Sequence, residues 1–74
     1  MNLHQGKIGS SYVVERIEIE TAIARRLQAL GMVEGTKVDI INGKRNGTLI
    51  IKVRGTRFAI GRRIAEAIQV KEAA

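Results

Sequence analysis

The pattern of apolar and polar residues changes its period along this chain, and each change predicts a new element. Residues 12–19 are rich in β-branched types, with Val13, Ile17 and Ile19 on one parity. We predict a strand there, and we expect its side chains on that parity to face the core. Glu15 falls on the same apolar parity, which indicates a bulge or an edge position at that residue.

The period becomes helical at Thr21, whose side chain suits an N-cap. An apolar stripe with spacings of four and three follows, formed by Ile23, Leu27 and Leu30. Gly31 suits the left-handed residue that ends a helix. These signals predict one short helix over residues 21–30, and its apolar stripe must pack on a core because so short a helix does not persist alone in water.

Alternation with a period of two returns after a tight connection over residues 31–35. Val38 and Ile40 face inward in a second strand, and two Asn-Gly pairs within residues 42–47 predict a turn between antiparallel strands. A second hairpin turn is expected at Gly55-Thr56. The inward positions on either side of it are Leu49, Ile51, Val53, Phe58 and Ile60.

The remaining residues predict a short helical turn and a last strand. Gly61 begins the turn, Ile64, Ala65 and Ile68 share one face, and Val70 closes the sheet. Residues 1–9 are expected to form a mobile N-terminal segment and residues 71–74 a frayed tail. Positive φ angles are expected at five glycines. These are Gly31, Gly35, Gly43, Gly47 and Gly55.

These elements together predict a mainly β fold in a single domain of residues 1–74. About five short strands, one short inserted helix and a short C-terminal helical turn are typical of a small SH3-like barrel, which leaves few exposed sheet edges. Cysteine is absent, which excludes disulfides and fits a reducing cytoplasm. Apolar runs are far too short for a membrane span or a signal peptide, so a soluble chain is expected.

The charge is strongly basic and unevenly placed. The formal net charge is +6, yet no acidic residue lies between Lys44 and Arg63. These cations are either a solvated face or a docking surface for an anionic partner. The candidate partner-binding residues are Arg25, Arg26, Lys44, Arg45, Arg54, Arg57, Arg62 and Arg63.

Catalytic chemistry finds little support in these residues, so we predict that the chain is not an enzyme. His4 is the one histidine, and nothing orients it toward Ser10 or Ser11 as a nucleophile would require. The glycine spacing of a phosphate-binding loop is missing too. With Phe58 expected in the core and Tyr12 expected to plug the barrel, few aromatics remain for binding proline-rich peptides or stacking on bases.

Metal binding finds equally little support. Glu15, Glu18 and Glu20 form the nearest acidic cluster, and we interpret them as a solvated face. His4 alone would be an adventitious ligand. No metal ligands and no cofactor are therefore predicted from the residues themselves.

Several segments resemble the ferrous-iron transport protein A (FeoA) family. Residues 26–32, RLQALGM, and residues 34–38, EGTKV, are similar to its helix, Leu-Gly stop and strand start. Residues 53–60, VRGTRFAI, with Ala65 and residues 68–70, are similar to its closing hairpin and ending. The family often has proline where this chain has Ile8 and Glu34, and an apolar residue where it has Gly6.

The resemblance implies an SH3-like fold in a cytoplasmic, prokaryotic protein that supports ferrous-iron uptake without catalysis. The implied partner is the large membrane permease with a cytoplasmic GTP-binding domain (FeoB). The association with transition metals is likewise implied by the family alone. Iron- and manganese-dependent repressors carry a similar domain, but this chain leaves no room beside the barrel for a DNA-reading helix-turn-helix.

Two alternatives stay open beside this interpretation. Residues 34–47 resemble the KOW motif of ribosomal and elongation proteins, which would make the chain an RNA-binding barrel that uses Lys44, Arg45, Arg54 and Arg57 on phosphates. The barrel could also sense iron directly. For a protein partner, the sequence favours neither the helix with Arg25 and Arg26 nor the basic hairpin, and it leaves self-association open.

Overall fold

The structure, a computed structural model, describes residues 1–73. Ala74, the last residue of the predicted tail, lies outside the described residues. The elements are, in order, η1 (Leu3–Gln5), β1 (Ser11–Ile17), α1 (Thr21–Ala29), β2 (Lys37–Gly43), β3 (Leu49–Val53), β4 (Thr56–Ile60), α2 (Arg62–Ala67) and β5 (Ile68–Glu72).

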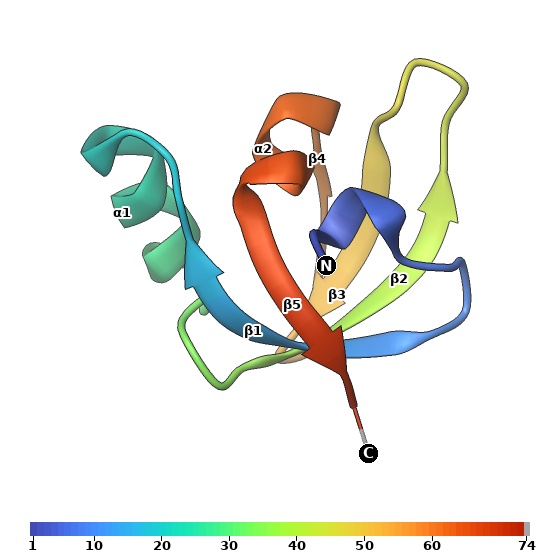
Figure 1. Cartoon of the computed structure of the whole chain (residues 1–74), viewed down its shortest axis with the longest axis horizontal. Coiled ribbons are helices and arrows are strands. Elements are labelled where there is room, and N and C mark those ends of the chain that lie inside the picture. Colours follow the sequence, from blue (N-terminus) through green and yellow to red (C-terminus); the bar gives the residue numbers. More distant parts are fainter. Residues whose placement is uncertain (74) are drawn as a thin grey trace.

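The strands form one antiparallel sheet of five strands in the order β4-β3-β2-β1-β5, and the sheet curves around the core (Figure 1). Both predicted hairpins are present, because β2 pairs with β3 and β3 pairs with β4. The two ends of the sheet, β4 and β5, are joined through α2. The predicted mainly β fold, with one inserted helix and a short C-terminal helical turn, is confirmed.

A bulge in β1 explains why its two halves bury opposite parities. Val14 pairs with Val70 and Arg16 pairs with Gln69, so Glu15 is the extra residue, as its place in the sequence predicted. The expectation that Val13 faces the core is wrong. Tyr12 and Val14 are buried instead, because the extra residue shifts the inward parity between the two halves of the strand.

The strands β3 and β4 follow the predicted alternation, with one correction at their turn. Leu49, Ile51 and Val53 are buried, as expected. The turn residues are not Gly55-Thr56 but Arg54-Gly55, because Val53 and Thr56 are paired. Positive φ angles of 52° at Arg54 and 83° at Gly55 match a type I′ turn, whose backbone twist suits a two-residue hairpin.

Four of the five expected glycines have positive φ. These are Gly31, Gly35, Gly47 and Gly55. The expectation is wrong for Gly43, which lies in β2 and pairs with Leu49. The prediction rested on the Asn42-Gly43 pair, but β2 continues through both of these residues.

Helix α1 begins and packs slightly differently from the prediction. Its N-cap is Glu20 and not Thr21, and no side chain caps it. Leu27 is buried and Ile23 packs against the core, but Leu30 remains 41% exposed, so the apolar stripe is shorter than predicted. Gly31 follows with a φ of 92°, as expected of a residue that ends a helix.

Two contacts join the ends of α1 to residues on either side of the edge strand β4. Glu20, before the helix, pairs with Arg63, which follows β4. Gly31, after the helix, lies against the side chain of Arg54, which precedes β4.

Both chain ends are more ordered than the sequence indicated. Within residues 1–9, η1 carries a capping box between Asn2 and Gln5, and Leu3 is fully buried. The predicted tail is wrong for Lys71 and Glu72, which belong to β5 and pair with β1. These segments are ordered because the N-terminal one docks on α2 and β5, which a local pattern does not reveal.

Among residues 1–73, no helix combines the length and the apolar composition needed to cross a bilayer.

Candidate interaction surface

The predicted cations lie on four parts of the surface. Arg25 and Arg26 are exposed on α1. Lys44 and Arg45 are exposed in the β2–β3 turn, and the structure brings Arg62 to them, since a Cβ on Gly47 in that turn would lie 2.8 Å from Arg62 Cβ. The remaining three lie elsewhere. Arg54 and Arg57 are on the β3–β4 hairpin, and Arg63 faces Glu20 of the α1 N-cap.

Two of the eight cations are engaged within the chain. Arg62 Nε lies 3.7 Å from a carboxylate oxygen of Glu66, and Arg63 donates to Glu20. Ion pairs of this exposed kind contribute little stability. Within residues 1–73 no ion pair involves the other six, so their charges remain available to a partner.

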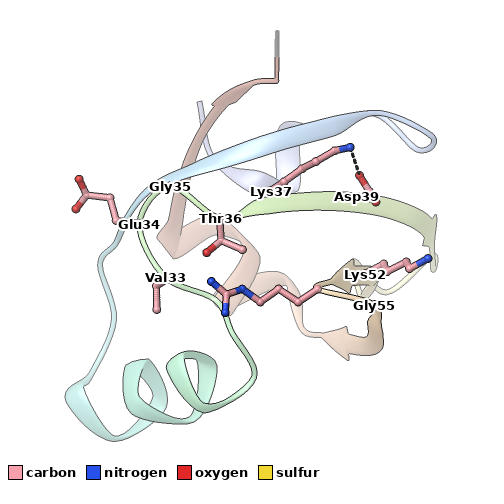
Figure 2. A pocket seen from close by; sticks show the side chains of 9 residues that line it. Val33, Glu34, Gly35, Thr36, Lys37, Asp39, Lys52 and Gly55 are labelled. Carbon is pink, nitrogen blue, oxygen red and sulfur yellow. Dashed lines mark ion pairs between the residues drawn. The ribbon is translucent and has the colours of Figure 1, made fainter.

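A groove of about 480 Å³ lies beside two of the strands and adds cations that the sequence analysis missed. We call it the Arg54 groove, and Figure 2 shows most of the side chains around it. Its walls are the α1–β2 loop and the β3–β4 turn. Its lining residues are Val33, Glu34, Gly35, Thr36, Lys37, Asp39, Lys52, Arg54 and Gly55.

Strand register explains how the floor of the Arg54 groove is assembled. Asp39 stands opposite Ser11 on one side and Lys52 on the other, and Lys52 stands opposite Arg57. A polar row therefore crosses four strands on the outer face of the sheet. The outward parity of Lys52 is visible in the sequence, but its neighbours across the sheet are set by pairing alone.

The carboxylate of Asp39 interacts with residues other than Lys52. This carboxylate accepts a hydrogen bond of 2.5 Å from Ser11 Oγ. Lys37 Nζ lies 4.0 Å from the same oxygen, and Figure 2 shows this ion pair. Glu34, the other acid at the groove, is exposed and points away from it in Figure 2. The Arg54 groove therefore carries more positive charge than its own acids neutralise.

Ser11, Tyr12 and His4 lie in different environments. Ser11 Oγ donates to Asp39, and Tyr12 is buried as the predicted barrel plug, its hydroxyl accepting from the Lys7 N–H at 2.8 Å. His4 is not mobile as expected. It lies in η1 with a buried Nδ1 that has no hydrogen-bond partner among residues 1–73.

Comparison with known proteins identifies the family. The model of the FeoA domain matches residues 1–72, which is nearly the whole chain. The chain belongs to the FeoA family. A protein of Methanocaldococcus jannaschii, described provisionally as Fe(2+) transport protein A, is 34% identical over 67 residues, which cover 90% of this chain and 80% of that relative.

Solved FeoA structures share the fold of this chain. FeoA of Chlorobium tepidum superposes with a TM-score of 0.94 at 31% identity, over 100% of this chain and 71% of that one. FeoA of Stenotrophomonas maltophilia, solved with zinc and described as a prokaryotic SH3 domain protein, gives 0.83 at 34% identity, over 96% and 89%. The fold of this FeoA domain is SH3-like, as predicted.

The acidic and imidazole side chains described in this FeoA domain are scattered over its surface. No group of three His, Cys, Asp or Glu side chains comes together within residues 1–73. Glu18 pairs with Arg16 at 2.8 Å, and this hydrogen bond and charge raise the pKa of Arg16. Glu20 pairs with Arg63. These two carboxylates therefore neutralise arginines.

Proposed function

We propose that this FeoA domain is a non-catalytic interaction module of ferrous-iron uptake, and that it regulates the iron permease by contacting its cytoplasmic GTP-binding domain (FeoB). The domain would then work in the cytoplasm of a prokaryote, and ferrous iron would be the cargo of the permease. The observation that carries this proposal is the match to the FeoA domain over residues 1–72.

The chemistry of the chain supports an interaction role. Six of the eight predicted cations make no ion pair within residues 1–73, which leaves them for an anionic surface. The S. maltophilia relative is described as a candidate ferrous-iron transport activating factor, which agrees with a regulatory contact.

A pull-down with the purified GTP-binding domain of the permease from the same genome tests this function. We expect the full chain to bind this domain in the presence of GDP or of a non-hydrolysable GTP analogue. Salt should weaken the binding, because basic residues contribute to it. A cytosolic GTPase of similar charge is the control for non-specific attraction. Absence of binding with both nucleotides would contradict the proposal.

A second candidate is RNA binding through the β2–β3 turn. One observation favours it: Arg62 lies against Gly47 of this turn, so a third cation is close to Lys44 and Arg45. Phosphate contacts would make the affinity fall steeply with salt. A gel shift with single-stranded RNA at low salt tests it, and a free band at all protein concentrations would remove this candidate.

A further inference from the structure

We infer that the Arg54 groove binds an extended acidic segment of the partner, with two carboxylates separated by one residue. The identity of the partner rests on the proposed function, whereas the groove and its ligand chemistry rest on the geometry of this chain. Arg54 was among the predicted cations, whereas Lys37 and Lys52 were not, so the groove joins one predicted cation to two others.

Arg54 is held at the groove by two backbone features. Its φ of 52° is unusual for a residue with a side chain, and it places arginine where a type I′ turn favours asparagine or glycine. Its aliphatic stem lies against Gly31, where a Cβ would come within 3.0 Å of Arg54 Cδ. The stem can lie there because Gly31 has no side chain, so the guanidinium is positioned beside the groove before any partner arrives.

Lys52 supplies the second positive charge, and the fold leaves that charge uncompensated. It stands opposite Arg57, and like charges directly opposite each other on a sheet are unfavourable. Its other cross-strand neighbour, Asp39, already accepts from Ser11 and faces Lys37. Within residues 1–73 no ion pair involves Lys52 or Arg57. A bound carboxylate would relieve this repulsion.

The backbone spacing of Lys52 and Arg54 matches that of alternate residues in an extended ligand. Lys52 and Arg54 flank the extended, inward-facing Val53, so their Cα atoms are about 6.6 Å apart. Carboxylates at positions one and three of an extended chain repeat the same spacing. Val33, which is 38% exposed on the opposite wall, offers an apolar contact to a side chain of the segment.

Peptide titration followed by amide resonances of the full chain tests the groove directly. The probe is acetyl-Gly-Asp-Val-Asp-Gly-amide, and its matched control has Asn in place of both Asp residues. We expect shifts from the acidic peptide that concentrate on residues 33–37 and 52–55, and that weaken with salt. The Asn peptide should give at most a small response.

Three outcomes of that titration would overturn the inference. One is the absence of shifts at millimolar peptide, and another is shifts spread equally over α1 and the β2–β3 turn. The third is a stronger response of the same groove residues to a uridine decanucleotide, which would assign the site to nucleic acid.

Calorimetry with the GTP-binding domain then separates the groove from the proposed function. Three double variants each remove two positive charges: Lys52→Gln/Arg54→Gln, Arg25→Gln/Arg26→Gln and Lys44→Gln/Arg45→Gln. We expect only the first to lower the affinity by roughly tenfold or more, which corresponds to about 1.4 kcal/mol. Amide spectra of each variant confirm that it is folded.

If the wild type binds and the Lys52/Arg54 variant binds equally well, the groove is not the docking site and the proposed function stands. If the wild type does not bind, the proposed function fails, and the peptide titration still decides the groove.

Discussion

Gly6 shows how a single missing side chain shapes the N-terminal segment. A Cβ at this position would lie 2.5 Å from Ile40 Cδ1 and 2.8 Å from Tyr12 Cε2. Its φ is −69°, so the backbone itself would accept alanine. The family often has an apolar residue here, but in this chain the packed side chains of Tyr12 and Ile40 occupy the space.

We therefore expect Gly6→Ala to lower the free energy of unfolding by about 1–3 kcal/mol, the usual cost of overpacking a core. Urea unfolding followed by circular dichroism measures it. Gly61→Ala is the control, because a Cβ there would meet nothing within 4 Å and φ is −72°. If Gly61→Ala lowered the free energy of unfolding as much as Gly6→Ala, the steric explanation would be contradicted.

Arg54 gives a prediction in the opposite direction. Its positive φ is unfavourable for arginine and better tolerated by asparagine. We expect Arg54→Asn to raise the free energy of unfolding by roughly 1 kcal/mol while weakening the binding of acidic peptide to the groove. Thermal unfolding and the peptide titration measure the two effects.

The control for Arg54→Asn is the same replacement at Arg57, an exposed residue of β4. Asparagine is unfavourable in a strand, so this variant should lose stability. If both replacements change the free energy of unfolding equally, the positive φ of Arg54 does not explain the effect of Arg54→Asn.

At the scale of elements, α1 is held by few contacts. Its one buried residue is Leu27, and the helix is too short to form alone. We expect Leu27→Ala to lower the free energy of unfolding by about 2–4 kcal/mol, because it leaves a cavity between the helix and the core. Chemical denaturation measures the change.

Leu30→Ala is the matched control, because Leu30 lies at the end of the same helix and is 41% exposed. Leu30→Ala should lower the free energy of unfolding much less than Leu27→Ala. Equal losses would mean that the helix is stabilised by its propensity rather than by its packing.

At the scale of the whole molecule, charge repulsion opposes the fold. The net charge is +6, and the ion pairs among residues 1–73 are all exposed. We therefore expect the free energy of unfolding to rise as sodium chloride goes from about 20 mM to about 300 mM, since salt screens the repulsion. Urea unfolding at each salt concentration measures it.

The variant Lys44→Glu/Arg45→Glu controls for that explanation. It lowers the net charge from +6 to +2, because each replacement changes the charge by two units. Its stability should depend less on salt than that of the wild type. A wild type destabilised by salt would show that its surface ion pairs outweigh the repulsion.

The sequence by itself determined the five strands and the two α-helices, because their signals are local. Alternation gave the inward residues of β3, the acidic interruption at Glu15 gave the bulge of β1, and Asn-Gly pairs gave the β2–β3 turn. The sequence also identified the family, since order and spacing along the chain carry that resemblance.

Only the tertiary structure decided which charges act together. Lys37, Lys52 and Arg54 meet at one groove because strand register and the contact between Arg54 and Gly31 join residues far apart in the chain. The order of residues 1–9 and of Lys71 was decided in the same way, by docking against partners distant in sequence. A periodic pattern records which face of an element is buried, but it does not record which other element covers that face.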